Sequence, residues 1–227
     1  MSNYGKIKKK ESDKLIFQDV HFSWNNKKIF LIKNCSFSLS DPGLWMLVGK
    51  NGCGKSTLLK LIKGILKPTS GDIKRPSNLS LVFQNPDHQI LMPTCGSELI
   101  LNIKGDLNKE IINYKVNHSL ASVGLVGFWK RPIHTLSGGQ KQRLAIASAL
   151  ISESKFILMD EPTALLDKLS RKKILSIIKS LVQNKTNPKT VLWITHRLDE
   201  LVYADKVSVM KMGKLSSWQD PNNLNYD

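Results

Sequence analysis

A short glycine-rich segment constrains the fold more than any other part of this 227-residue chain. It runs from Gly49 to Thr57 and reads Gly-Lys-Asn-Gly-Cys-Gly-Lys-Ser-Thr, which matches the spacing Gly-x4-Gly-Lys-Ser/Thr of a phosphate-binding loop. The apolar run Leu44–Val48 before it predicts a buried strand, and Ser56–Ile65 after it predicts a helix with one apolar face. Such a strand–loop–helix unit predicts an α/β domain that holds a phosphate at the start of the helix.

Each residue type in the loop suits the binding of a nucleoside triphosphate. Glycines let the backbone curl around a phosphate with several N–H groups pointing inward and no Cβ in the way. We expect Lys55 to reach the β- and γ-phosphates and the Ser56 hydroxyl to bind Mg²⁺. The alternative is a glycine-rich turn that arises by chance. The predicted nucleotide-binding residues of this loop are Gly49, Lys50, Asn51, Gly52, Cys53, Gly54, Lys55, Ser56 and Thr57.

The remaining apolar runs alternate between strands and helices. Strand-like alternation covers Leu15–Trp24 and Phe30–Ser40, which are separated by a turn at Trp24–Lys27. An amphipathic pattern predicts a helix over Leu169–Val182. Alternation of this kind implies a parallel sheet that helices cover on both faces. Further strands are predicted at Leu79–Phe83, Phe156–Met159, Val191–Thr195 and Lys206–Met212.

Residues 95–151 differ from the rest because they contain no strong strand pattern. Short amphipathic segments such as Glu110–Ala121 are broken by glycine and proline, which predicts a helical insertion. We therefore expect one domain over residues 14–220 with a helical subdomain at about 95–151. Residues 1–13 are polar and rich in lysine, which predicts a flexible basic tail.

A second glycine motif lies late in the helical insertion. Leu136-Ser137-Gly138-Gly139-Gln140 precedes a predicted helix that runs to about Ile151. Free N–H groups at a helix start bind anions, so the motif predicts a second anion site. A serine-capped helix with a flexible entry is the alternative interpretation.

Polar side chains follow three predicted strands, at the end where parallel sheets bind their ligands. Asp160 and Glu161 follow the predicted strand Phe156–Met159, where Asp160 suits Mg²⁺ binding through water and Glu161 suits polarisation of an attacking water. His196 and Gln84 follow two other strands in the same way. Each is a weak signal alone, because polar residues after strands commonly face solvent.

In their order along the chain, these motifs resemble those of the ATP-binding-cassette (ABC) ATPase family, from about residue 14 to 215. The resemblance implies a P-loop NTPase (RecA-like) parallel-sheet core with an N-terminal antiparallel β subdomain and an inserted helical signature subdomain. It also implies an ATPase that uses ATP and Mg²⁺ in a head-to-tail dimer. ATP would then lie between the phosphate loop of one subunit and Ser137-Gly138-Gly139 of the other.

The same resemblance implies roles for single residues. Trp24 would stack on adenine, although an ordinary tryptophan at a strand end is the alternative. Asp167 ends the segment Thr163-Ala164-Leu165-Leu166-Asp167, which lacks the serine that the family commonly has after the threonine. The implied hydrolytic residues are Lys55, Gln84, Glu161 and His196, the implied Mg²⁺ ligands are Ser56, Gln84 and Asp160, and the implied ATP contacts also include Gln140 and Asp167.

The segment Gln84–Gln89 narrows the class further. It reads Gln-Asn-Pro-Asp-His-Gln, which resembles the ATPases of energy-coupling-factor importers for cobalt, nickel and vitamins. The resemblance implies a motor that pairs with a second ABC ATPase subunit, identical or related, and docks on an integral membrane transport subunit at the cytoplasmic face. Ile90, Leu91 and Met92 are the predicted contacts with a helix of that subunit, unless the chain's own core buries them.

The basic composition leaves a second class to consider, a soluble ABC ATPase that acts on ribosomes or nucleic acid. The formal net charge is +16, yet only five of the 34 basic residues are arginines. Base recognition depends on the arginine fork, so we expect surface lysines and no nucleic-acid partner. Three scattered cysteines, one of them in the phosphate loop, predict a reducing cytosol.

Overall fold

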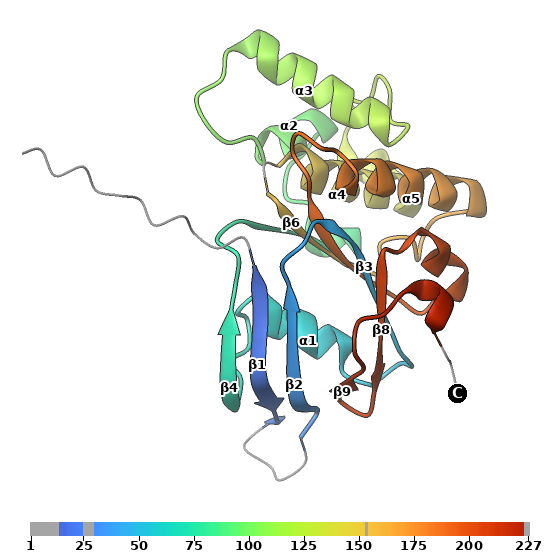
Figure 1. The fold of residues 1–227 in the computed structure, drawn as a ribbon. Coiled ribbons are helices and arrows are strands. Elements are labelled where there is room, and N and C mark those ends of the chain that lie inside the picture. Colours follow the sequence, from blue (N-terminus) through green and yellow to red (C-terminus); the bar gives the residue numbers. More distant parts are fainter. Residues whose placement is uncertain (1–13, 25–29, 153, 225–227) are drawn as a thin grey trace, which may run out of the picture.

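The computed structural model describes residues 14–24, 30–152 and 154–224, which form two sheets and five α-helices (Figure 1). The predicted flexible tail, residues 1–13, lies outside the described residues. The first sheet has three strands in the order β2-β1-β4, and the second has six in the order β5-β6-β7-β3-β8-β9. The two sheets account for the predicted β subdomain and the predicted parallel core.

The three-stranded sheet is antiparallel and confirms the two predicted N-terminal strands. Its strands are β1 (Leu15–Phe22), β2 (Ile32–Leu39) and β4 (Ser70–Lys74), and β1 pairs with both neighbours. Most of the predicted turn at Trp24–Lys27 lies outside the described residues. Gly71 in β4 has φ +83°, and a Cβ there would lie 2.3 Å from the carbonyl oxygen of Asp19. Only glycine lets the two backbones approach this closely.

The six-stranded sheet contains five parallel strands and one short antiparallel edge strand. The predicted strands are confirmed, each within one or two residues. Each parallel strand ends at the same edge of the sheet, which brings the residues that follow the strands together. The strands are β3 (Gly43–Val48), β5 (Leu79–Val82), β6 (Phe156–Asp160), β7 (Thr190–Thr195), β8 (Lys206–Lys211) and β9 (Lys214–Leu215), of which β9 was not predicted.

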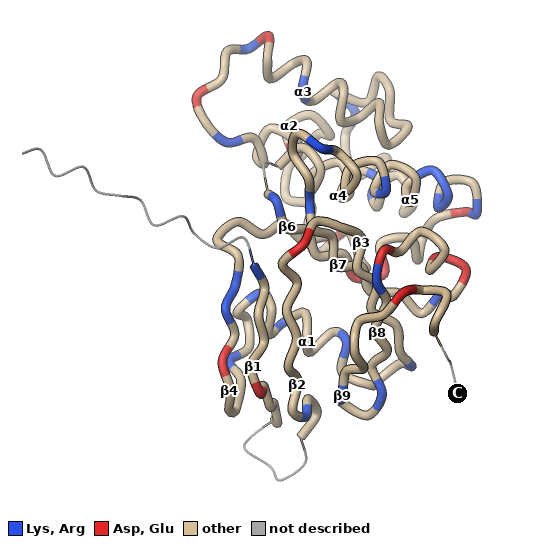
Figure 2. The backbone as a smooth tube through the Cα atoms, viewed as in Figure 1, with Lys and Arg blue, Asp and Glu red and all other residues tan. Residues whose placement is uncertain are grey.

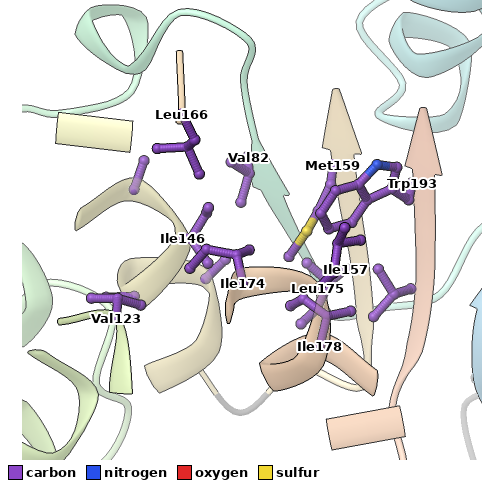
Figure 3. Close-up of a cluster of buried hydrophobic side chains, with 14 of the residues drawn as sticks. Val82, Val123, Ile146, Ile157, Met159, Leu166, Ile174, Leu175, Ile178 and Trp193 are labelled. Carbon is purple, nitrogen blue, oxygen red and sulfur yellow. The ribbon is translucent and has the colours of Figure 1, made fainter. Parts of the chain in front are cut away.

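Helices cover both faces of this sheet, as predicted. α1 (Lys55–Ile62) packs between the two sheets, against the face of Leu47, Leu158 and Leu192. α4 (Gly138–Ile151) and α5 (Lys168–Val182) cover the opposite face. Figure 3 shows this second core, where Trp193 and Met159 of the sheet lie beside Leu175 and Ile178 of α5.

The phosphate-loop helix α1 ends at Ile62, three residues before the predicted end at Ile65. Gly64 follows with φ +76°, a conformation that commonly ends helices. The guanidinium of Arg75, which follows β4, donates hydrogen bonds of 2.8–3.1 Å to the carbonyls of Leu61 and Ile62. The end of the helix is therefore set by a residue of another element, which the local pattern does not reveal.

The predicted helical segment is confirmed as helical. α2 (Cys95–Ile100) and α3 (Lys109–Ser122) precede α4 and lie at the top of Figure 1, away from the antiparallel sheet. α3 buries only Val116, Ser119 and Leu120, and it leaves Tyr114 exposed. Among the described residues, no helix is long and apolar enough to cross a membrane.

Candidate nucleotide-binding and hydrolysis site

The phosphate loop closes around its own lysine. The Lys55 ammonium donates to the carbonyl oxygens of Gly49 at 2.6 Å and Lys50 at 3.0 Å, and Lys55 is only 6% exposed. Gly52 and Gly54 have φ values of +78° and +116°, which favour glycine. The loop thus holds one buried positive charge at its centre, as a phosphate-binding loop requires.

The N-terminus of α1 differs from those of the other described α-helices. Its N-cap residue is Gly54, which has no side chain to accept a hydrogen bond from the first turn. The other four have side-chain caps, so their first turns are already partly satisfied. The N–H groups of α1 therefore suit a phosphate. The capping residues of the other four helices are Thr94, Asn108, Ser137 and Asp167.

Three predicted hydrolytic residues meet at the carboxyl edge of the sheet. The Glu161 carboxylate lies between His196, whose Nδ1 is 3.1 Å from Oε1, and Gln84, whose Nε2 donates to Oε2 at 3.1 Å. The Glu161 backbone has φ +44°, which is uncommon for a residue with a side chain, and its N–H donates to the carbonyl of Ile194. The site therefore orients one carboxylate through two neighbours from other strands.

The neighbouring carboxylate has different electrostatics. Burial raises the pKa of Asp160 to about 6, and the charge of Glu161 adds to this effect, while Lys55 opposes it. A desolvated carboxylate beside a second negative charge is stabilised when a cation binds. This environment fits the predicted role of Asp160 near Mg²⁺, and Ser56 follows Lys55 in the first turn of α1.

No set of three or more His, Cys, Asp or Glu side chains in the described part of the chain could hold a metal ion. Mg²⁺ is commonly held by one or two protein oxygens together with substrate phosphates and water. The residues predicted for Mg²⁺ fit a site of this kind, in which the nucleotide and water supply most of the ligands.

The second predicted anion site lies at the start of α4. Ser137 and Gln140 form a reciprocal cap, in which the Ser137 N–H donates to Oε1 of Gln140 at 3.0 Å. The Ser137 N–H is therefore already used, and the first-turn N–H groups of Gly138 and Gly139 remain as the anion donors. A Cβ on Gly139 would lie 3.2 Å from the carbonyl oxygen of Leu165, so the segment before α5 lies directly over these glycines.

Two further predicted ATP contacts have simple local roles in the structure. The Asp167 carboxylate accepts from the N–H groups of Leu169 and Ser170 at 2.9 Å and caps α5. Hydrogen bonds from Ser170 lower the pKa of Asp167. Trp24 is 50% exposed and meets Phe22 edge-on, so the ring is open to stacking. Their contact with ATP remains a prediction.

A groove of about 430 Å³ opens beside the Gln84–Gln89 segment. Leu91 is 76% exposed at its wall, whereas Ile90 packs partly against the core, so the three predicted contact residues differ in burial. The buried carboxylate of Glu98 accepts hydrogen bonds from the N–H groups of Leu91 and Met92, both at 3.0 Å. The lining residues include Asp87, Ile90, Leu91, Met92, Ile133 and Lys141.

The residues that hold Gln84 in place were missed from the sequence. The backbone N–H of Phe83 donates to Gln89, and its carbonyl accepts from Gln142 of α4, both at 3.1 Å. The ammonium of Lys63, just after α1, lies 4.2 Å from the centre of the Phe83 ring. Isolated amides carry no periodic signal, so only the folded structure could reveal these contacts.

Comparisons with known proteins agree with this geometry. The model of the ABC transporter family matches residues 32–164. ABC transporter I family member 10 from Arabidopsis thaliana is 43% identical over 189 residues, which are 82% of this chain and 69% of that protein. Energy-coupling factor transporter ATP-binding protein EcfA1 from Oceanobacillus iheyensis is 33% identical over 222 residues, covering 92% of this chain and 79% of that protein.

Solved structures confirm the predicted fold class. CbiO1 from Clostridium perfringens, part of the ABC transporter complex CbiONQ, superposes with a TM-score of 0.78 at 29% identity, over 92% of this chain and 88% of that one. An ATP-binding cassette solved as a dimer in a post-hydrolysis state with ADP and Pi gives a TM-score of 0.78 at 26% identity. That match covers 92% of this chain and 100% of the other.

Proposed function

The chain belongs to the ABC transporter family of ATP-binding subunits, and we propose that it is the ATP-hydrolysing motor of an energy-coupling-factor-type uptake transporter. Relatives named as energy-coupling factor ATP-binding proteins support the type of transporter. The Gln84–Gln89 segment, on which the expectation first rested, supports it as well. Within this proposal residues 14–220 act as one ATPase domain, and residues 95–151 act as its helical subdomain.

The observation that carries the ATPase role is the convergence of Gln84 and His196 on Glu161. A carboxylate held from both sides can accept a hydrogen bond from one water and polarise it for attack on the γ-phosphate. Lys55 at the centre of the loop stabilises negative charge on the phosphates as the reaction proceeds. The adenine would stack on Trp24.

Mg²⁺ fits the residues beside the loop. We place it with the Ser56 hydroxyl, the Asp160 carboxylate and the amide oxygen of Gln84, whose nitrogen is already used by Glu161. When bound, Mg²⁺ neutralises charge on the β- and γ-phosphate oxygens. Asp160 then stays ionised, because a cation opposes the burial that raises its pKa.

A second ABC ATPase subunit completes each site in this proposal. α1 and α4 pack on opposite faces of the sheet, so the phosphate loop and the start of α4 are separated within one chain. The start of α4, with Gly138 and Gly139, therefore serves the nucleotide of the partner subunit. The dimeric relative with ADP and Pi supports this arrangement. Asp167 lies at the same surface, after the segment that covers Gly139.

The groove beside Leu91 suits a cytoplasmic helix of the membrane subunit. Apolar side chains form its wall, and the Lys141–Asp87 ion pair at 2.7 Å provides a polar rim. A helix bound in the groove would shift the position of Gln84, because the Gln89 side chain accepts a hydrogen bond from the backbone N–H of Phe83, the residue before Gln84. The membrane partner would hold the chain at the inner face of the membrane.

The distribution of charge weighs against the soluble alternative. Lysine and arginine are spread over many elements of the described part of the chain (Figure 2). Arg75 and Arg143 donate to backbone carbonyls, Arg131 lies against Phe128, and Arg171 pairs with Asp199. These side chains serve the fold and are committed to intramolecular contacts, so they offer little to a nucleic acid.

Leu91→Glu tests the docking proposal, because it places a charge in the apolar groove without touching the phosphate loop. We expect the variant to leave the membrane fraction and to keep its fold and its affinity for ATP. Val126→Glu is the matched control, since Val126 is 74% exposed and lies outside the groove. It should stay with the membrane.

Two results would contradict the proposal. Leu91→Glu could remain bound to membranes as tightly as the control. Alternatively, the unmodified protein could sediment with ribosomes or DNA, with an affinity that falls steeply as salt concentration rises. The second result would favour the soluble class.

A further inference from the structure

A buried carboxylate outside the predicted site joins two of its loops. Glu200 is 1% exposed, and its Oε1 accepts a hydrogen bond of 2.5 Å from the hydroxyl of Thr163. Its Oε2 accepts a bond of 3.0 Å from the indole N–H of Trp193. Thr163 and Trp193 are buried as well, at 1% and 0% exposure. Both oxygens of the carboxylate are thus used by neutral donors in the interior.

The two loops connected in this way carry the hydrolytic residues. Thr163 lies two residues after Glu161, and Glu200 lies four residues after His196. β6 and β7 are paired up to Asp160 and Ile194, and the chain then diverges into these loops. The Glu161 N–H bond to Ile194 ties the loops together at their start.

These contacts close a ring. At the solvent side, His196 meets the Glu161 carboxylate at 3.1 Å, and the His196 side chain is 50% exposed. At the interior side, Glu200 meets Thr163. A shift of the segment after Glu161 would therefore be passed to the loop of His196 through Glu200. The same segment covers Gly139 through Leu165, at the surface where we place the partner subunit.

The outer side of the Glu200 turn is also anchored. The turn Leu198–Tyr203 carries Asp199, which pairs with Arg171 of α5 at 3.3 Å. The backbone N–H of Arg197 donates to the hydroxyl of Thr195 at 3.0 Å. The turn is thus fixed to α5 outside and to β7 at its start, and Glu200 links it to the segment after Glu161.

We propose that Glu200 is a positioning residue for ATP hydrolysis, which holds the Glu161–Asp167 segment and the His196 loop in one arrangement through Thr163 and Trp193. It does not touch the nucleotide and acts through Glu161 and His196. The inference rests on the proposed ATPase function. It adds that the segment facing the second subunit is mechanically connected to His196.

The proposal is tested by steady-state ATP hydrolysis of the full-length protein. Glu200→Leu removes both acceptors, and we expect kcat to fall about 10- to 100-fold, because small displacements of reacting groups have effects of this size. KM for ATP should change by less than about twofold, since the phosphate loop is untouched. Glu200→Gln should keep kcat within about threefold, because its amide can accept from Trp193 and donate to Thr163.

Thr163→Val is the milder variant, which keeps the shape and removes only the hydroxyl. We expect a loss of about tenfold in kcat, and no further loss when it is combined with Glu200→Leu, since both break the same contact. Ser119→Ala is the matched control, because it removes a buried hydroxyl bond of 3.0 Å to the carbonyl of Ala147 in the helical region.

A structural role alone predicts different results. If Thr163→Val lowers kcat no more than Ser119→Ala at equal loss of thermal stability, the proposal is wrong. The connection to His196 is wrong if Thr163→Val lowers kcat by the same factor in a His196→Ala background, where no imidazole remains to be positioned. Absence of ATP hydrolysis in the unmodified protein would instead overturn the proposed function.

Discussion

Glu161→Gln is the substitution that examines the hydrolytic site most directly. The change keeps the size of the side chain and removes its negative charge. In the structure that charge has two effects, because Glu161 lies between His196 and Gln84 and also raises the pKa of Asp160. The substitution should therefore alter both the rate of hydrolysis and the pH dependence of Mg²⁺ binding.

The rate effect follows from the loss of the group that polarises water. A positioned general base contributes about 10²- to 10⁴-fold, so we expect kcat to fall at least about 100-fold, which corresponds to about 2.7 kcal/mol of activation free energy. ATP binding should persist, because Lys55 and the loop backbone are unchanged. The ATP-bound dimer should accumulate as a result.

The pH effect has a defined sign. The pKa of Asp160 is raised from 3.8 to about 6. At pH values between these two, the folded, nucleotide-free protein therefore holds a proton on Asp160 that the unfolded chain has lost. The free energy of unfolding therefore decreases as pH rises through this window, and Mg²⁺ binding weakens as pH falls below about 6. In Glu161→Gln one cause of the raised pKa is absent, so the midpoint for Mg²⁺ binding should move to lower pH.

Three measurements follow these effects: phosphate release for the rate, size-exclusion chromatography with ATP for the dimer, and Mg²⁺ titration of ATP binding between pH 5 and 8, a range chosen to span the raised pKa of Asp160. Asp160→Asn is the control for the last, because it should remove the pH dependence below pH 7. Normal turnover in Glu161→Gln would refute the assignment of the water-polarising group. A midpoint that stays in place or rises would refute the electrostatic reasoning.

The remaining predictions concern the phosphate loop and the antiparallel sheet. Lys55→Ala should weaken ATP binding at least about tenfold in a fluorescence titration, because charge-assisted hydrogen bonds to phosphate are lost; unchanged affinity would remove Lys55 from the site. Cys53 is half-buried while the other two cysteines are buried, so a maleimide should label it first, and ATP should slow only that reaction; equal labelling with and without ATP would place the thiol away from the nucleotide. Gly71→Ala should lower the free energy of unfolding in urea by about 3 kcal/mol or more, because its Cβ would lie 2.3 Å from a backbone oxygen, whereas Gly105→Ala, with open space around it, should lower it by about 1 kcal/mol. Equal losses for the two variants would show that the backbone near Asp19 moves away and relieves the contact.

The sequence predicted best where a local pattern and a chemical motif coincide. The phosphate loop with its strand and helix, and the helix that starts after Ser137, depend on nearby residues alone, and both are confirmed as elements. β4 was missed because nearly all its residues are exposed, which gives no alternation to recognise. The early end of α1 was missed because Arg75 acts from another element.

In the site, too, residues in local patterns were predicted and residues fixed by distant contacts were not. Glu161, His196 and Gln84 were predicted from their places after strands, and the structure brings them together. Glu98 and Glu200 could not be found this way, because a single acid in a helical or turn pattern usually faces solvent. Their burial depends on backbone and side-chain donors that come from distant parts of the chain.

The placement of α1 and α4 on opposite faces of the six-stranded sheet predicts how mixtures of two inactive variants behave. In the dimer that we propose, one chain offers its phosphate loop to one nucleotide and the start of its α4 to the other. Two inactive populations, one altered at Lys55 and the other at Ser137, should therefore restore activity when mixed, because some mixed dimers contain one site with both halves intact. Dilution should abolish this complementation before the individual subunits unfold.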